Sequence, residues 1–351
     1  MRFFGRRERP ASGPNPAAAR EFWGWWRDQG RETVTSELTA DRLAELEPLL
    51  SQRVQAIHPE LSWELSRGGH AEHALVITAA GDPALRPTAR RWLQHAPPAD
   101  ATWEFHDTRQ PCDVDGLTLS FHDVDIHLGD TVVGTESTPA LVHVQVFNPG
   151  LLRLDARASL EAAFLTLDSA LGEEATETWL GEVSVVRERP PNGMSLTTLR
   201  GVVAELAREV TSGDGLLSML EARTRKGPLL AMVREPLRPM IAPHLDTHVL
   251  VSVPFTTRGS SGMPTDEGLE HLQAFEEHLT TLAGDSGRWV GVETCAGVRR
   301  IHFYADSSTP VVAQIDAGVA GWTDGRVTVK AEHDPGWDNV ADLRAATTHA
   351  R

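Results

Sequence analysis

The chain has 351 residues, of which 40% are hydrophobic and 23% are charged, as in an ordinary globular protein. Its 33 Lys and Arg residues against 49 Asp and Glu residues give a formal net charge of −16. An acidic surface repels phosphate backbones and anionic lipids, so the charge argues against nucleic-acid and membrane partners. No stretch approaches the roughly 18 consecutive apolar residues of a membrane span. The length predicts two domains or one large one.

The N-terminal segment has a basic start that is followed by prolines and glycine rather than by an apolar run. It therefore lacks the pattern of a secretory signal, and we expect a disordered tail over residues 1–16. The two cysteines, Cys112 and Cys295, lie too far apart for a zinc pattern or a disulfide framework. Two unpaired thiols indicate a reducing compartment, so the cytoplasm is the expected location.

The sequence pattern predicts a first domain over residues 17–190 that contains both helices and strands. Its opening helix contains Phe22, Trp23, Trp25 and Trp26, a cluster typical of a core or an anchor between domains. Further helices are expected over 43–57, 87–96 and 160–171, and strands over 61–65, 74–78, 103–105, 117–127, 141–147 and 179–186. The elements show no strict βαβ repeat, which favours an α+β domain with a mixed or antiparallel sheet.

A helical connector is predicted over residues 191–243. The run Pro190-Pro191-Asn192-Gly193 is the best domain boundary. A helix follows, with an apolar stripe from Leu199 to Val210, and a second helical stretch is expected over 216–223. Three prolines, Pro236, Pro239 and Pro243, then favour short pieces over residues 229–243.

Residues 244–345 predict a second α+β domain. Strands are expected over 249–253, 289–294, 298–304 and 327–330, and helices over 269–282 and 310–318. The resulting β-α-β-β-α-β order is that of a ferredoxin-like fold.

The last hundred or so residues resemble a bacterial family known as domain of unknown function 695. The matching segments are Pro254-Phe255, Gly262-Met263-Pro264, the 272–279 helix, Gly297-Val298-Arg299-Arg300, His302-Phe303-Tyr304 and Asp334-Pro335-Gly336-Trp337. The first domain is similar to another uncharacterised bacterial domain, through Phe22-Trp23, His58-Pro59-Glu60-Leu61, Ala96-Pro97-Pro98, Leu167-Asp168-Ser169 and Leu171-Gly172-Glu173. These resemblances imply a soluble bacterial protein, and they supply neither an activity nor catalytic residues.

Two polar runs are candidate metal sites. Asp123, Asp125 and His127 share one face if their segment is a strand, and two carboxylates with an imidazole can bind a divalent metal. The alternative is the solvated side of a half-buried strand, because Val124 and Ile126 occupy the other face.

The second candidate site consists of His244, Asp246 and His248, which alternate directly before the apolar strand at Val249. The alternative is a solvated entrance to that strand. His302 and His333 belong to this site only if the fold brings them close.

Nucleophilic chemistry has little support in the sequence. Cys295 follows a strand, and His302 lies on the predicted partner strand, but a buried inert cysteine is the alternative. The carboxylates near Asp168 and Glu173 are explained by a helix that ends at Gly172. The sequence contains no nucleophile elbow, Walker A motif or dinucleotide fingerprint in its required context. We therefore predict no catalytic residues and no cofactor.

Two functions remain open. The first hypothesis is a non-enzymatic interaction or regulatory protein, because aromatic anchors and an acidic surface suit contacts with an unknown protein partner. The rival is a metal-dependent or small-molecule enzyme with a site between the two domains.

Overall fold

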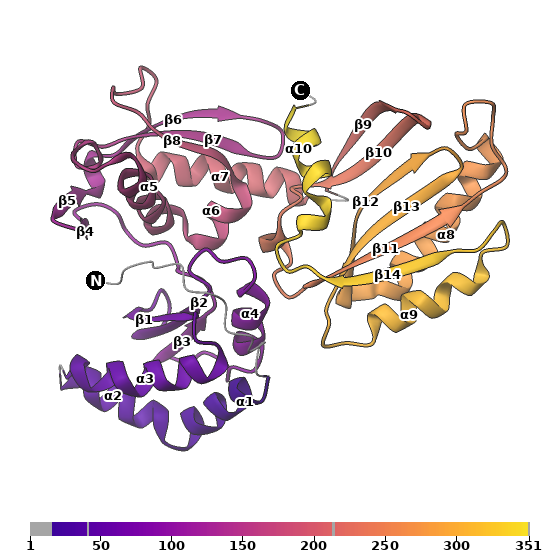
Figure 1. The fold of residues 1–351 in the computed structure, drawn as a ribbon. Coiled ribbons are helices and arrows are strands. Elements are labelled where there is room, and N and C mark those ends of the chain that lie inside the picture. The colour runs from indigo at the N-terminus through magenta and orange to yellow at the C-terminus, as the bar shows by residue number, and fades with distance from the viewer. Residues whose placement is uncertain (1–15, 41, 213–214, 350–351) are drawn as a thin grey trace. The chain divides into compact units, whose positions relative to one another are not determined.

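The computed structural model describes residues 16–40, 42–212 and 215–349 (Figure 1). The chain divides into two compact units, residues 1–207 and 208–351. Helices and strands alternate through both units, and the strands form several sheets. The predicted α+β class is confirmed. The expected disordered tail lies outside the described residues except for Pro16, where the first helix begins.

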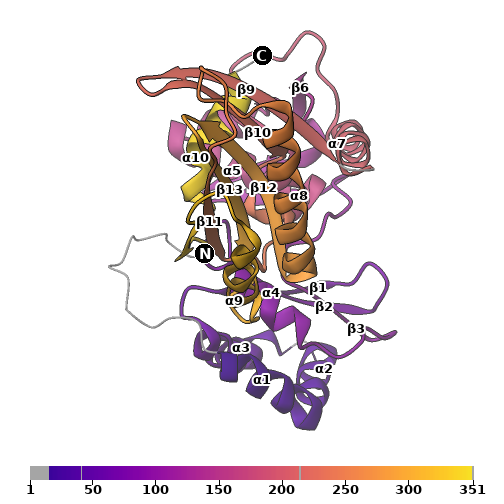
Figure 2. The same ribbon diagram turned by 90° about the vertical axis from the view of Figure 1, so that its right-hand side faces the viewer.

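The first part of the first unit packs helices on a small sheet (Figure 2). Its elements are α1 (Pro16–Trp25), the π-helix η1 (Trp26–Gly30), α2 (Arg31–Thr39), α3 (Leu43–Ile57), β1 (Ser62–Arg67), β2 (His73–Thr78), α4 (Arg86–Gln94) and β3 (Trp103–His106). The sheet has the order β1-β2-β3, with β1 antiparallel and β3 parallel to β2. The predicted hairpin at residues 61–78 is therefore present.

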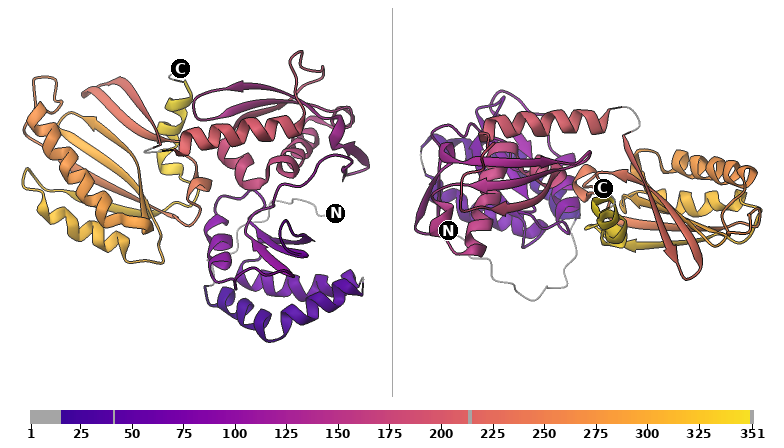
Figure 3. Two further views of the ribbon diagram at one scale, coloured as in Figure 1. Left: turned by 180° about the vertical axis from the view of Figure 1, so that it is seen from behind. Right: turned by 90° about the horizontal axis from the view of Figure 1, so that it is seen from above.

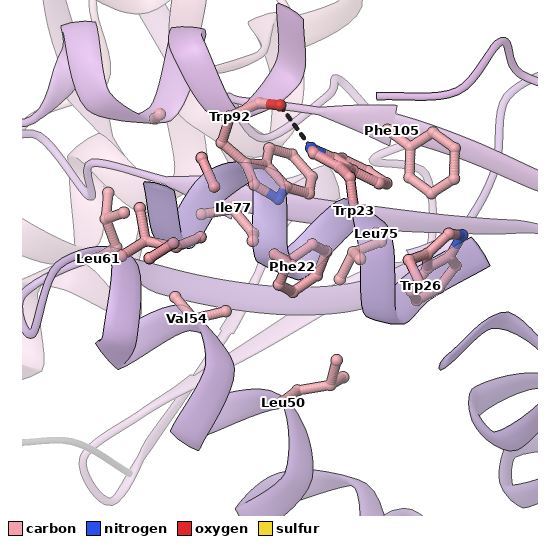
Figure 4. Close-up of a cluster of buried hydrophobic side chains, with 14 of the residues drawn as sticks. Phe22, Trp23, Trp26, Leu50, Val54, Leu61, Leu75, Ile77, Trp92 and Phe105 are labelled. Carbon is pink, nitrogen blue, oxygen red and sulfur yellow. Dashed lines mark hydrogen bonds between the residues drawn. The ribbon is translucent and has the colours of Figure 1, made fainter. Parts of the chain in front are cut away.

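Aromatic side chains fill the core between these helices and the sheet (Figure 4). The Trp23 and Trp92 rings stack with their centroids 4.7 Å apart, and Phe22 meets Trp92 edge to face. The indole N–H of Trp23 donates to the Trp92 carbonyl at 2.6 Å. Burying indoles is favourable when the N–H finds an acceptor. The aromatic cluster of the opening helix is thus core, as its composition predicts.

The rest of the first unit contains two further sheets. Its elements are β4 (Thr118–Phe121), β5 (Val124–His127), η2 (Leu128–Asp130), β6 (Val132–Ser137), β7 (Val142–Phe147), η3 (Leu151–Arg153), α5 (Ala156–Leu171), α6 (Glu173–Trp179), β8 (Leu180–Val185) and α7 (Leu196–Thr211). Strands β4 and β5 form a hairpin, and β6-β7-β8 form a mixed sheet. The Asp155 carboxylate caps α5 by accepting from the backbone N–H groups of Arg157 and Ala158 at 3.0 and 2.9 Å.

The start of α7 is attached to the first unit. Met194 pairs with Val133 through backbone hydrogen bonds of 2.9 Å. The Arg200 guanidinium donates to the carbonyls of Ala170 and Cys112 at 2.6 and 2.5 Å. These contacts explain why the division between the compact units lies at residue 207, within α7, and not at the proline run.

The second unit is built on one antiparallel sheet of six strands in the order β14-β11-β13-β12-β10-β9. Its elements are β9 (Leu216–Thr224), β10 (Gly227–Glu235), η4 (Pro239–Ile241), β11 (Thr247–Pro254), α8 (Asp266–Ala283), η5 (Gly284–Ser286), β12 (Gly287–Cys295), β13 (Val298–Ala305), α9 (Val311–Gly318), η6 (Val319–Gly321), β14 (Thr328–His333), η7 (Asp338–Val340) and α10 (Ala341–His349).

Helices α8 and α9 cover one face of this sheet (Figure 3). The apolar side chains of Val251, Ile301 and Leu272 meet there. On the other face, Val340 and Leu343 beside and within α10 pack against Tyr304, Trp337 and Leu220. The sheet is therefore an inner layer, and α10 covers only part of its second face.

The predicted helix over residues 216–223 is wrong. The segment is strand β9, which pairs with β10 around Arg225 and Lys226, so that Leu220 lies opposite Ala231. Its burial alternates, with Ser218 and Leu220 inside. Leu-Leu-Ser-Met-Leu suits a helix as well as a strand, and pairing with β10 decided between them. Among the described residues of the predicted connector, the helices are α7 and the short 3-10 helix η4.

None of the helices within the described residues combines the length and the apolar character that a membrane crossing requires.

Candidate functional site

A group of polar side chains lies on the α10 side of the sheet in the second unit. Strand alternation places Val249 of β11 and Phe303 of β13 in the core under α8, so their neighbours point the opposite way. His248, His302 and Tyr304 therefore share the other face, where His248 lies opposite Tyr304 in the β11-β13 register. Three adjacent central strands supply this group, because Glu293 of β12 joins it.

The two histidines form a chain that ends at a carboxylate. The Nε2 atom of His248 lies 3.1 Å from Nδ1 of His302, and Nε2 of His302 lies 3.3 Å from Oε2 of Glu293. The hydrogen bond with His302 lowers the pKa of Glu293, which is therefore an ionised acceptor at neutral pH. For a neutral His302 ring, this places the proton on Nε2 and leaves Nδ1 to accept the N–H of His248.

His248 is held neutral. Burial lowers its pKa to about 4, the neighbouring His302 contributes in the same direction, and the Asp334 carboxylate opposes them. When His302 is neutral, Nε2 of His248 donates to it and Nδ1 of His248 carries the lone pair, for which the described residues supply no hydrogen-bond partner. A neutral imidazole oriented by a second group can act as a base or a ligand.

Tyr304 and Asp334 have a structural role beside the histidines. The Tyr304 hydroxyl donates to Oδ2 of Asp334 at 2.5 Å, and burial raises the pKa of Tyr304, so it stays protonated. Asp334 also accepts the backbone N–H groups of Asp338 and Asn339 at 2.9 and 2.8 Å. The Tyr304 ring stacks on Trp337 at 4.2 Å. These contacts hold the segment after β14 against β13.

The first unit has a buried charge network of its own. Arg86 and Glu173 are each 2% exposed, and Nη2 of Arg86 lies 2.7 Å from Oε1 of Glu173. The other oxygen of Glu173 accepts the Thr78 hydroxyl at 2.6 Å and the Arg109 backbone N–H at 3.0 Å. Glu177 also pairs with Arg86. The network joins β2 and α4 to α6.

Asp168, one turn before the end of α5, borders this network. Burial raises its pKa to about 7, and the negative charge of Glu173 adds to the shift. A hydrogen bond with Thr176 and the charge of Arg109 act in the opposite direction. The helix end expected at Gly172 is confirmed by its φ of +84°, but the sequence does not reveal that Glu173 is buried. Its partner Arg86 is 87 positions away.

The first predicted triplet is solvent-exposed. Asp125 and His127 lie on the exposed face of β5, whereas Asp123 lies in the turn between β4 and β5. Ser120 donates to the Asp125 carboxylate at 2.7 Å, and the Thr118 hydroxyl lies 2.8 Å from Nδ1 of His127. These are cross-strand pairs of a two-stranded hairpin, which favours a structural role.

The second predicted triplet is spread along the entrance to β11. The Asp246 carboxylate accepts the backbone N–H and the hydroxyl of Ser307 at 3.0 and 2.8 Å. His244 precedes the strand and is half-buried, whereas His248 belongs to the histidine chain. The fold brings His302 to His248, and it places Nδ1 of His333 3.8 Å from Asp246.

Within the described ranges, no group of three or more His, Cys, Asp or Glu side chains is placed to hold a metal ion. Metal binding by either triplet stays a prediction. The carboxylates of Asp125 and Asp246 each accept hydrogen bonds from neighbouring residues of the protein.

Cys295 and His302 do not meet as a nucleophile and base. The Sγ atom of Cys295 lies 3.6 Å from the Thr224 hydroxyl, and His302 forms hydrogen bonds with Glu293 and His248.

Arg299 and Arg300 lie on opposite faces of the sheet, as the alternation of side chains along a strand requires. Arg299 donates to Glu276 of α8 at 2.8 Å, whereas Arg300 lies on the other face, 4.0 Å from Glu293.

Strand β9 is an edge of the sheet with exposed apolar side chains. Its side chains alternate, so that Leu217 is 43% and Met219 is 72% exposed while Leu220 is buried. Met219 lies opposite Met232 of β10, whose side chain packs on the core under α8. The apolar face of the sheet thus continues beyond the helices to its edge strand β9.

Comparison with curated proteins gives no match. Among solved structures, the crystal structure of ttk003000868 from Thermus thermophilus aligns with 88% of this chain and 41% of that chain, at 11% identity and a TM-score of 0.14. The chain thus spans about two fifths of that protein, and a score of this size says nothing about shared fold.

The comparison with protein families gives a match that covers most of the second unit. The matched range extends from Leu237 to Leu343, so it includes β11 to β14 and the histidine chain, and it leaves out β9 and the first unit. The second resemblance, for residues 17–190, stays a prediction. Residues 237–343 of the chain match the model of a Family of unknown function (DUF695), as the C-terminal motifs predict.

Proposed function

We propose that this chain is a non-enzymatic interaction or regulatory protein that binds another polypeptide along β9. The observation behind the proposal is the edge position of β9 together with the exposure of Leu217 and Met219. An edge strand presents unpaired backbone N–H and C=O groups that can pair with another strand. Exposed apolar side chains on the same strand add specificity to such pairing.

Charge and compartment fit the same proposal. The net charge of −16 suits a protein partner better than a nucleic acid. Cys112 and Cys295 are both free thiols, and we propose the cytoplasm as the compartment. We also infer a ferredoxin-like arrangement for β11 to β14, whose sheet order is β14-β11-β13-β12.

The test compares baits in an extract of the host. Tagged wild-type protein, Met219→Lys and Leu152→Lys are used in parallel, because Leu152 is a 44% exposed leucine far from β9 in the sequence. We expect a partner that wild type and Leu152→Lys recover equally. Met219→Lys should recover at least about fivefold less, since losing about 1 kcal/mol of contact weakens binding to that extent. Equal recovery by all three baits would contradict the proposal.

The rival function, a metal-dependent or small-molecule enzyme, is favoured by one observation. Glu293, His302 and His248 form a chain that leaves a lone pair on a buried, neutral imidazole. A base oriented by a second group, which a carboxylate orients in turn, is a common catalytic arrangement. Nuclear magnetic resonance of the ring nitrogens tests it, with Glu293→Gln as the variant.

If the protein is an enzyme of this kind, we expect Nδ1 of His248 to be unprotonated near neutral pH. The Glu293→Gln variant should show a changed population of the His302 tautomers. A protonated Nδ1 on His248 counts against base or ligand chemistry there. Metal analysis of the purified protein separates the two forms of this function, because bound metal in stoichiometric amount is required for the metal-dependent form alone.

A further inference from the structure

The two edges of the six-stranded sheet differ in how they are protected. Strand β14 carries the exposed charged side chains Lys330 and Glu332, which discourage pairing with another strand. The first five residues of β9, Leu216 to Leu220, contain no charge. Isolated edges of soluble proteins are normally blocked by charge, proline or a bulge. This uncharged half of β9 is therefore a surface that a partner strand fits.

The sequence of β9 is self-complementary when two copies pair antiparallel. A two-fold axis perpendicular to the sheet keeps equivalent faces on the same side, and each possible register centres on one residue. With the axis at Ser218, Leu217 lies opposite Met219 of the second copy, and Met219 lies opposite its Leu217. Both exposed apolar side chains on each strand then contact an apolar neighbour, while Glu221 and Arg223 remain at the ends.

Other registers match less well. With the axis at Met219, Leu217 faces the carboxylate of Glu221 in the second copy. With the axis at Leu220, Met219 faces Glu221, and Leu217 faces Arg223. With the axis at Leu217, Met219 faces Gly215 and gains little contact. The apolar pairs therefore favour the register centred on Ser218.

We propose that the partner of β9 is a second copy of this chain, paired antiparallel about Ser218. The inference rests on the proposed function of β9 as a binding edge. The pairing extends the six-stranded sheet of one copy into that of the next. Five residues on each strand make the contact, which is small for a stable dimer, so the association depends on protein concentration.

Disulfide trapping tests the register. Cys112 and Cys295 are first replaced by serine, and Leu217→Cys and Met219→Cys are introduced separately on chains with tags of different mass. Side chains directly opposite each other bring the Cα atoms to about 4.5–5.5 Å, within the range that a disulfide spans. The exposure of Leu217 and Met219 means that neither substitution disturbs the core.

We expect mild oxidation of the Leu217→Cys and Met219→Cys mixture to give a mixed disulfide-linked dimer in good yield. Either variant alone should give much less. A mixture of Leu217→Cys with Arg223→Cys is the matched control, because it cross-links only with the axis at Leu220. Cross-linking that favours any other combination overturns the inference.

Sedimentation velocity provides a second readout without cysteine substitutions. Wild type and Leu152→Lys should show a dimer fraction that rises with concentration, whereas Met219→Lys stays monomeric. A wild type that remains monomeric up to on the order of 1 mM overturns the inference. In that case the extract test decides about the proposed function. If wild type recovers a different polypeptide that Met219→Lys does not recover, the proposed function stands and only the second copy is excluded as the partner. If both baits recover the same polypeptides, the proposed function fails as well.

Discussion

The Nε2 atom of His248 lies 3.1 Å from the Nδ1 atom of His302, and both rings are 6% exposed. The contact joins β11 to β13 on the face of the sheet that α8 does not cover. Adding a proton to His248 places a positive charge in a buried site and removes the lone-pair acceptor of the ring. This relationship ties the stability of the second unit to pH.

The pH dependence of His248 has a defined sign. In the unfolded chain the ring binds a proton below a pKa of about 6.5. In the folded chain its pKa is about 4. The stability contributed by the neutral ring is thus complete above pH 6.5 and is lost as the pH falls from 6.5 to 4. We expect this loss to amount to about 2 kcal/mol after allowing for partial solvent screening.

Urea unfolding of wild type and His248→Gln between pH 4 and 8 measures that loss. The variant should lose less stability than wild type toward pH 4, because glutamine does not titrate and can still donate to His302. His70→Gln, which replaces an exposed histidine, is the control and should follow wild type. Parallel curves for wild type and His248→Gln would show that the ring titrates normally.

Asp168 is expected to change the free energy of unfolding with pH in the opposite direction to His248. Its folded pKa is about 7, against about 3.9 in an unfolded chain, so the folded state holds the proton more tightly. Its contribution is present at pH 4 and is lost as the pH rises through 7. Asp168→Asn should therefore gain about 2 kcal/mol relative to wild type between pH 4 and pH 8, after a discount for partial exposure. Glu161→Gln on the outer side of α5 should show no such gain.

Removing one partner of the Arg86 and Glu173 pair should be costly. Arg86→Met leaves the Glu173 carboxylate buried without its cation, and we expect a loss of about 3–5 kcal/mol in unfolding free energy. Arg157→Ala removes an exposed ion pair with Glu161 on one helix and should cost less than about 0.5 kcal/mol. Equal losses for both variants would mean that the buried pair is worth no more than a surface pair.

Gly172 is required by its backbone and its neighbours. It has a φ of +84°, and a Cβ atom there would lie 2.9 Å from Cδ of Pro111. Gly172→Ala should therefore destabilise the first unit by about 1–3 kcal/mol. Gly201→Ala in α7 is the matched control, since its Cβ meets nothing within 4 Å. That control should stabilise the protein by about 0.5–1 kcal/mol because alanine favours the helix. Thermal unfolding of both variants measures the two effects.

Local patterns predicted most elements because the responsible residues are neighbours in the chain. The alternation of Val124 and Ile126 with exposed side chains predicts β5, and Gly172 predicts the end of α5. The same reasoning failed at residues 216–223, where a short apolar run suits both a helix and a strand. It also missed α6 between Gly172 and β8.

The sequence by itself determined the acidic character, the α+β class, the aromatic core of the first unit and the motifs of residues 237–343. Tertiary structure decided which polar residues meet. His248 and His302 are 54 positions apart, and Arg86 and Glu173 are 87 positions apart. Neither pair therefore produces a short sequence pattern from which the contact could be predicted. Strand register and packing set these contacts, and they also expose Met219 at an edge of the sheet. Such contacts depend on the whole fold, because burial and pairing between distant segments have no period in the sequence.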